Sequence, residues 1–92
     1  MTRHLHISGL VQGVGYRASF AAQARALHLS GWVRNRRDGT VEALVAGELA
    51  QLDAITEWAR RGPPAARVDT VVATATDDAA VDAGSFKILP TA

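Results

Sequence analysis

The chain has no cysteine, no long hydrophobic run and almost no net charge. Without cysteine there can be no disulfide and no thiolate chemistry; together with the lack of a recognisable signal peptide, this predicts a cytoplasmic protein. The longest apolar run is a few residues, whereas a bilayer-spanning helix needs roughly 20. Ten Lys and Arg against nine Asp and Glu give a formal charge of +1, so no long-range field attracts nucleic acid or an anionic membrane. Any anion must be bound locally.

The length of 92 residues suits one compact domain and is too short for two. We therefore expect a single domain over residues 1–92, acting as a monomer without a nucleic-acid or membrane partner. Nothing in the composition indicates a linker, a low-complexity tract or an internal repeat.

Hydrophobic periodicity predicts a mixed order of strands and helices. Polar and apolar residues alternate over 3–8, which is typical of a strand with Leu5 and Ile7 facing a core. Over 17–28 apolar residues recur every three or four positions without an internal Pro or Gly, which predicts a helix. The remaining expected elements are strands at 31–35, 40–46, 68–76 and 86–89, a turn at 36–39, a helix at 48–61 and a loop at 77–84.

The order βαββαβ, with one extra terminal strand, predicts an α+β fold. It fits a ferredoxin-like α/β sandwich, in which two helices cover one face of a mostly antiparallel sheet of four or five strands. Because such a fold hosts many unrelated functions, the function must be argued from particular residues.

Three glycines and one arginine mark the passage from the first strand to the first helix, in the segment Gly9-Leu10-Val11-Gln12-Gly13-Val14-Gly15-Tyr16-Arg17. Glycines can adopt positive φ, so successive backbone N–H groups can converge on an anion at a helix N-terminus. Arg17 falls in the first helical turn, where a cation is unfavourable unless an anion compensates it. The pattern indicates a phosphate site, although taken alone it is also typical of a tight connection. The spacing of a nucleotide-binding P-loop is absent.

The string Ser8-Gly9-Leu10-Val11-Gln12-Gly13-Val14-Gly15-Tyr16-Arg17 resembles the signature of the acylphosphatase family. A second segment, Gly31-Trp32-Val33-Arg34-Asn35 followed by Asp38-Gly39-Thr40-Val41, resembles the second signature of that family at the expected distance. The length, the order of elements and the segment 62–68 are also similar to the family, so the resemblance covers nearly the whole chain.

This resemblance implies hydrolysis of acyl phosphates to a carboxylate and inorganic phosphate, without a metal or any other cofactor. Arg17 matches the phosphate-binding arginine of the family, and Asn35 matches the asparagine that positions the attacking water. The backbone that matches the phosphate cradle is that of Val11, Gln12, Gly13, Val14, Gly15 and Tyr16. A loose phosphoryl-transfer transition state needs positioning and charge stabilisation more than a strong nucleophile, so these groups suffice.

Two positions depart from the family pattern. Arg36 stands where many members have a small hydroxyl residue. The segment Phe86-Lys87-Ile88-Leu89-Pro90 lacks the Arg or Tyr that often follows the last aliphatic residue, and Pro90 cannot donate a ladder hydrogen bond. These departures leave open the fine geometry of the site and the stability of the terminal strand.

Other residues are interpreted as structural. His4 and His6 share one strand face without a Cys, Asp or Glu nearby in the sequence, so no metal site is expected. His28 suits the C-terminal end of the first helix as a cation. The arginines of the turn (Arg34, Arg36 and Arg37) and the carboxylates of Asp38, Glu42, Glu48 and Asp53 are expected to be solvated surface. Trp32 and Trp58 fit packing better than base stacking.

Three alternatives to a free-standing acyl phosphate hydrolase remain open. A non-catalytic anion binder would keep Arg17 and the loop but would not need Asn35. An RNA-binding module would need exposed aromatic residues on the middle strands, and 40–46 contains none. A carbamoyl-phosphate-handling domain of a larger maturation protein shares the same chemistry, but the short chain disfavours it.

Overall fold

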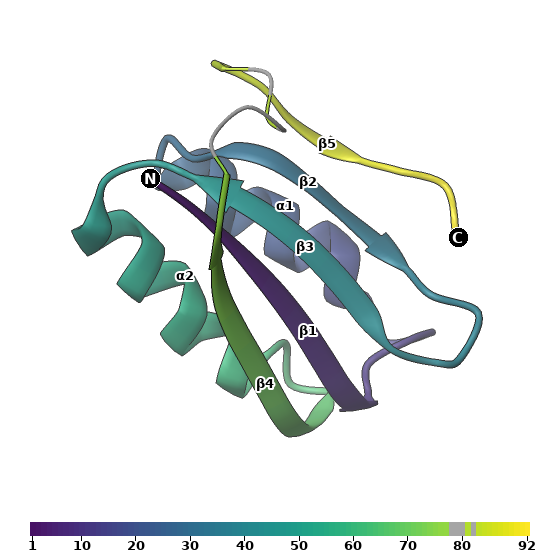
Figure 1. Cartoon of the computed structure of the whole chain (residues 1–92). Helices are drawn as coiled ribbons and strands as arrows, with labels where there is room; N and C mark the ends of the chain where they lie inside the picture. The colour runs from purple at the N-terminus through teal and green to yellow at the C-terminus, as the bar shows by residue number, and fades with distance from the viewer. Residues whose placement is uncertain (78–80, 82) are drawn as a thin grey trace.

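The computed structural model describes residues 1–77, 81 and 83–92, and in them a five-stranded sheet is covered by two helices (Figure 1). The strands are β1 (Thr2–Leu10), β2 (Ser30–Asn35), β3 (Val41–Ala46), β4 (Arg67–Thr76) and β5 (Phe86–Ile88). The helices are α1 (Tyr16–Ala26), which follows β1, and α2 (Leu49–Arg61), which follows β3. The predicted order of elements is therefore confirmed.

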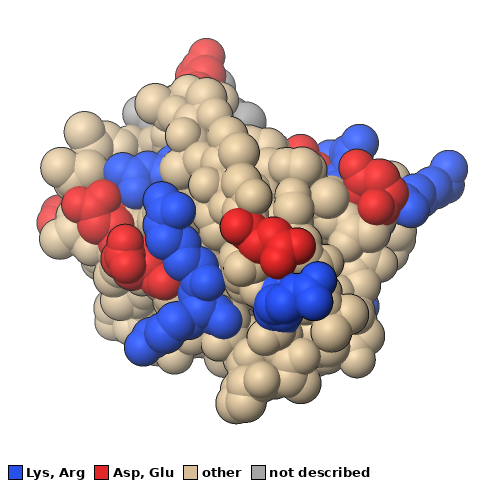
Figure 2. Space-filling model, turned by 90° about the horizontal axis from the view of Figure 1, so that it is seen from below, with Lys and Arg blue, Asp and Glu red and all other residues tan. Residues whose placement is uncertain are grey.

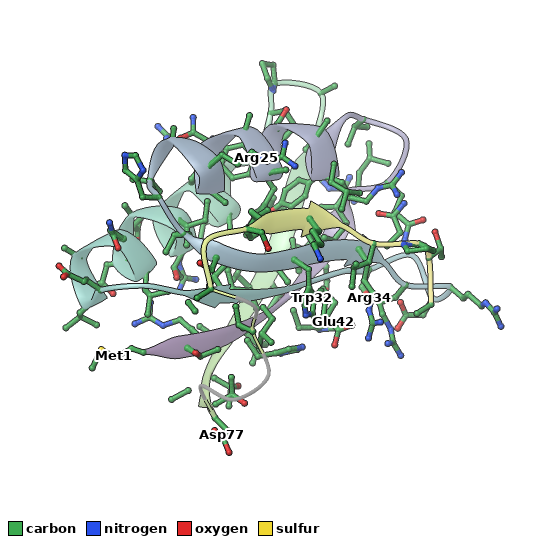
Figure 3. The ribbon with its side chains drawn as sticks, turned by 90° about the horizontal axis from the view of Figure 1, so that it is seen from above. Met1, Arg25, Trp32, Arg34, Glu42 and Asp77 are labelled. Atoms are coloured by element: carbon green, nitrogen blue, oxygen red, sulfur yellow. The ribbon has the colours of Figure 1, made fainter. Side chains whose placement is uncertain are left out.

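The strands lie in the order β4-β1-β3-β2-β5. β1 pairs antiparallel with β3 and β4, and β2 pairs antiparallel with β3, whereas β2 and β5 are parallel. Both helices lie on one side of this sheet (Figures 1 and 3). The expected ferredoxin-like arrangement, with a mostly antiparallel sheet, is confirmed.

The core lies between the sheet and the helices. Leu5 and Ile7 are fully buried, as the alternation in β1 predicts. From α1, Phe20 packs against Trp58 of α2 and Phe86 of β5, with ring centroids 5.9 Å apart in each pair. These aromatic contacts fix the start of the last strand against α1.

Element boundaries differ from the prediction by one or two residues at several ends. β1 extends to Leu10, and α1 begins one residue before Arg17. α1 ends at Ala26, since Leu27 caps it and His28 adopts a left-handed φ of 58°. His28 therefore lies beyond the helix, and Arg25 is the basic residue of its last turn. Half of the expected loop at 77–84, namely residues 78–80 and 82, lies outside the described residues.

Neither helix described by the structure is long and apolar enough to cross a membrane.

α2 begins with a reciprocal capping box, in which the Glu48 side chain accepts a hydrogen bond from the Gln51 backbone. The Gln51 side chain accepts in return from the Glu48 N–H at 3.0 Å. Glu48 is thus a structural cap on α2.

Candidate active site

The loop of residues 11–15 between β1 and α1, called the glycine loop below, has the backbone conformation that the sequence predicts. Gly13 and Gly15 have φ values of 76° and 78°. A Cβ built on either glycine would meet no atom within 4 Å, so conformation rather than space requires glycine there. Gly15 is the N-cap of α1 and provides no side-chain cap, which leaves the first N–H groups of the helix available to an anion.

The Arg17 side chain lies in the first turn of α1, which contains no acidic residue. None of the carboxylates in the described part of the chain forms an ion pair with its guanidinium. Arg17 borders a hollow of about 220 Å³, called the Arg17 hollow below, and the other residues that line it are Gly13, Gly15, Tyr16, Ala18 and Ile88. A cation without a protein partner beside two left-handed glycines is suited to bind an anion.

Asn35 is the last residue of β2, and its side chain points to the helix side of the sheet. The strand alternates so that Gly31, Val33 and Asn35 are buried, with Asn35 only 9% exposed. Its Oδ1 atom is buried and has no hydrogen-bond partner among the described residues. Since a buried carbonyl oxygen without a partner is costly and rare, this atom is an available acceptor for a water molecule.

The Gln12 side chain connects the glycine loop to the turn that follows Asn35. Its Nε2 donates hydrogen bonds to the carbonyl oxygens of Arg36 at 2.7 Å and Thr40 at 2.8 Å. These carbonyls belong to the two ends of the turn between β2 and β3. Gln12 therefore ties the glycine loop to the turn that follows Asn35, although Asn35 does not itself line the Arg17 hollow.

The chain after β5 continues beside β2 as far as Asn35. The Leu89 N–H donates to the Val33 carbonyl at 2.9 Å, and the Ala92 N–H donates to the Asn35 carbonyl at 3.1 Å. The Arg37 N–H donates to the Ala92 carbonyl at 3.0 Å. Pro90 therefore interrupts the regular strand without detaching the tail, and the backbone of Asn35 is held from this side as well.

A sequence model of the acylphosphatase family matches residues 3–88. The acylphosphatase of Acidovorax sp. (strain JS42) is 59% identical over 71 residues, which are 77% of this chain and 73% of that protein. The acylphosphatase of Azoarcus sp. (strain BH72) is 51% identical over 89 residues, which are 97% of this chain and 89% of that protein. The chain belongs to the acylphosphatase family.

An acylphosphatase structure from Coxiella burnetii agrees with this assignment. It has a TM-score of 0.89 and 36% sequence identity, and the match covers 96% of this chain and 90% of that one. The chain is thus an acylphosphatase-type hydrolase, and its substrate class is a small acyl phosphate. The resemblance stated from the two sequence motifs is confirmed.

Two side chains in this region belong to the core, namely Val11 of the glycine loop and Tyr16, the first residue of α1. Val11 and Tyr16 are each 1% exposed, and the Tyr16 hydroxyl donates to the Ala59 carbonyl at 2.8 Å. Burial raises the pKa of Tyr16 far above its usual range, so its hydroxyl stays protonated. From these residues only the backbone N–H groups remain for a phosphoryl group.

On the sheet face away from the helices, the Glu42 carboxylate contacts three basic side chains. The expectation of a solvated carboxylate at this position is therefore wrong. His4 Nε2 lies 2.7 Å from its Oε2, and Arg34 Nε and Arg36 Nη1 lie 2.7 Å and 3.4 Å from its Oε1. Figure 3 shows Trp32, Arg34 and Glu42 together on this face, where the Arg34 guanidinium lies 4.7 Å from the Trp32 ring centroid. The antiparallel register of β2 and β3 places Arg34 opposite Glu42, a pairing that the predicted hairpin could have revealed.

Partial burial pushes the pKa of Glu42 upward, but the hydrogen bonds from His4 and Arg34, together with their charges, outweigh it. The pKa of Glu42 therefore lies below its usual range. Glu42 thus binds both residues that flank Asn35 in the sequence. It holds them on the face opposite the Asn35 side chain.

No metal site is evident on the same face. His6 Nε2 lies 3.1 Å from Thr40 Oγ1, and Thr40 in turn donates to Asp38. Within residues 1–77, 81 and 83–92, no three His, Cys, Asp or Glu side chains are close enough to hold a metal ion. His6 thus has a hydrogen-bond partner in the turn before β3, and His4 has one in Glu42 of β3.

The surface charges are mostly interspersed in sign. In the view of Figure 2, acidic and basic side chains lie next to one another rather than in a patch of one sign. Three such pairs on the structure are Arg3–Asp53, Arg60–Glu57 and Arg67–Asp69, with separations of 3.1, 3.7 and 3.3 Å. Arg17 differs from these arginines because no carboxylate among the described residues pairs with it.

Proposed function

We propose that this acylphosphatase hydrolyses the carboxyl–phosphate bond with two groups of distinct roles. The glycine loop and Arg17 hold the phosphoryl group, and Asn35 positions the attacking water. The observation that carries the proposal is the buried, unpartnered Oδ1 of Asn35, in a strand end that Gln12 ties to the glycine loop. A structural asparagine would be expected to satisfy that oxygen within the protein.

Binding of the phosphoryl group relies on fixed donors. Backbone N–H groups at the start of α1 and the planar guanidinium of Arg17 can contact several phosphoryl oxygens together. Because these donors are already oriented by Gly13 and Gly15, little reorganisation is needed when charge develops in the transition state. The first helical turn adds a favourable dipole for the same anion.

In the chemical step the water oxygen forms a bond to phosphorus as the bond from phosphorus to the acyl oxygen breaks. The electron pair of the breaking bond leaves on the carboxylate, and one water proton passes to a phosphoryl oxygen or to solvent. Asn35 Oδ1 accepts a hydrogen bond from the water and so aims its lone pair at phosphorus. The products are a carboxylate and inorganic phosphate.

This step needs no general acid, since the leaving carboxylate is a weak base. Among the described residues that line the Arg17 hollow, the titratable side chains are Tyr16 and Arg17. The raised pKa of Tyr16 and its bond to Ala59 remove it as a proton donor or acceptor. The proposed mechanism therefore uses no proton transfer by a side chain of the hollow, and it includes no metal or other cofactor.

The test compares the wild type with Arg17→Lys and Asn35→Ala on benzoyl phosphate in excess chelator, with Arg61→Lys as a control on exposed α2 surface. Arg17→Lys should lose both phosphate affinity and turnover, because lysine cannot form the planar fork. Asn35→Ala should keep its inhibition constant for inorganic phosphate but turn over at least about 100-fold slower, as for a lost transition-state contact.

Each outcome is decisive. A wild type that binds phosphate without turnover would make the chain a non-catalytic anion binder. Full activity of Asn35→Ala would mean that another group positions the attacking water. Loss of activity on adding chelator would contradict the metal-independent mechanism.

A further inference from the structure

We propose that Ile88 forms the binding site for the acyl group of the substrate, so that the enzyme favours small acyl phosphates with an apolar acyl part. This inference rests on the proposed function, since it assumes that the phosphoryl group is held beside Arg17. It concerns the other end of the same substrate.

Ile88 is an apolar side chain on the wall of the Arg17 hollow. It lies on β5, where it pairs in register with Val33 of β2. Val33 stands two residues before Asn35 in that strand. Side chains alternate along a strand, so Ile88 shares the face of Phe86, whose ring packs against Phe20 of α1. Ile88 thus faces the start of α1, where Arg17 lies.

Ile88 keeps 43% of its surface exposed, although Phe86 on the same face is 6% exposed. The other large hydrophobic side chains that are exposed in the described residues, namely Met1, Leu10, Leu49 and Val72, do not line the Arg17 hollow. The exposed apolar surface of Ile88 is therefore the part that a ligand in this hollow can cover, and covering it is favourable.

We place the leaving group in this hollow, on the side of the phosphorus away from the water that Asn35 is proposed to hold. In-line displacement needs the water and the leaving oxygen on opposite sides of phosphorus. Asn35, which holds the water, does not line the hollow, whereas Arg17 and the two glycines do. The acyl group then extends from the phosphoryl group over Ile88.

The size of the hollow restricts the acyl group. Its volume of about 220 Å³ is below the roughly 300–1,000 Å³ of pockets that enclose drug-sized ligands. A phosphoryl group with a short aliphatic or single-ring acyl chain is the class that suits this space. A carbamoyl or acetyl group is too short to gain much from Ile88.

The test measures kcat/KM for benzoyl phosphate and acetyl phosphate with the wild type and Ile88→Thr, which keeps the β-branched shape but adds a hydroxyl. Each variant is compared with the wild type on the same substrate, so the intrinsic reactivity of the two acyl phosphates cancels. Val72→Thr, on the exposed edge strand β4, is the matched control. The inhibition constant of inorganic phosphate is measured for all three proteins.

Ile88→Thr should lower kcat/KM for benzoyl phosphate by about 5- to 10-fold, below the 10- to 200-fold of an enclosed pocket because this one is open. Acetyl phosphate should change less than about 2-fold, and phosphate inhibition should stay the same, because neither ligand reaches Ile88. An equal fall for both substrates, no fall for benzoyl phosphate, or the same fall in Val72→Thr overturns the proposal. A wild type without turnover on either substrate overturns the proposed function itself.

Discussion

The two halves of the candidate site are held by different physical means. The glycine loop is set by the backbone conformation of Gly13 and Gly15, around which the structure leaves open space. The end of β2 is instead enclosed by contacts with residues far away in the sequence, including hydrogen bonds from Gln12 and the tail that ends at Ala92. Local conformation fixes the half that is proposed to bind the phosphoryl group, and tertiary contacts fix the half that carries Asn35.

This difference explains how the candidate site combines backbone donors at a helix N-terminus with a buried amide oxygen that has no hydrogen-bond partner among the described residues. Backbone N–H groups can be aimed by a short loop alone, since their directions follow from φ and ψ. An amide oxygen such as that of Asn35 remains unpartnered only where the surrounding structure prevents it from finding another donor. Substitutions in the two halves should therefore lower the free energy of unfolding by different amounts.

The largest effect is expected from adding a methyl group in β2. In Gly31→Ala the new Cβ would lie 1.8 Å from the Leu44 carbonyl oxygen, at a φ of 132° that alanine rarely adopts. β2 and β3 would have to separate, so we expect a loss of about 3 kcal/mol or more in the free energy of unfolding, measured in urea. Gly13→Ala meets no atom and should cost only about 1–2 kcal/mol, from its left-handed φ.

Comparing Gly31→Ala with Gly13→Ala also separates an effect on stability from an effect on phosphate binding. Gly13→Ala should remain folded and yet bind inorganic phosphate more weakly, because its N–H groups are redirected. Equal losses of stability in the two variants would show that space, rather than conformation, restricts the glycine loop as well.

A smaller effect is expected from cutting the link between the halves. Gln12→Ala removes two hydrogen bonds, but each carbonyl that loses one keeps another, from the Gly39 N–H to Arg36 and from the Arg36 N–H to Thr40. The free energy of unfolding should fall by about 1–2 kcal/mol, whereas kcat should fall roughly 10-fold, since Asn35 is no longer aligned with the loop. Gln23→Ala, at an exposed position of α1, is the control.

For Gln12→Ala the informative quantity is the fall in kcat relative to the fall in the free energy of unfolding. A fall in stability with unchanged kcat would mean that the two halves keep their alignment without this side chain.

The smallest effect, of about 1 kcal/mol, is expected from Glu42→Gln on the face away from the helices. Because the folded-state pKa of Glu42 is lowered, its carboxylate stabilises the fold above the pKa of the unfolded chain, near 4.3. That contribution is lost as the pH falls through the lower, folded-state pKa. The wild type should thus exceed Glu42→Gln in stability at pH 7, and the gap should narrow as the pH falls below the pKa of the unfolded chain and close below the folded-state pKa.

Urea unfolding at pH 7, 5, 4 and 3 measures this gap. Glu57→Gln is the control, since its carboxylate pairs with Arg60 at 3.7 Å but its side chain is 80% exposed. A gap for Glu42→Gln that stays constant with pH would mean that hydrogen-bonding shape, rather than charge, holds Arg34 and Arg36.

Much of the fold followed from local patterns. The alternation in β1, the apolar stripe of α2 and the turn at Asp38-Gly39 predicted their elements within a residue or two. The end of α1 was less predictable, because His28 takes a left-handed φ at a position where glycine is the usual residue. The family signatures located Arg17 and Asn35 as candidates, and their roles stay predictions for the experiments above.

The sequence by itself determined the order of elements, the left-handed glycines and the position of Arg17 in the first helical turn, because each depends on residues close together in the chain. The tertiary structure decided which distant groups meet: Gln12 with the turn after Asn35, Glu42 with His4 of β1, and Ile88 with the Arg17 hollow. These contacts depend on strand order and register, and the parallel pairing of β2 with β5 joins residues more than 50 positions apart. No local pattern specifies such a pairing, since it is fixed only when the whole core packs.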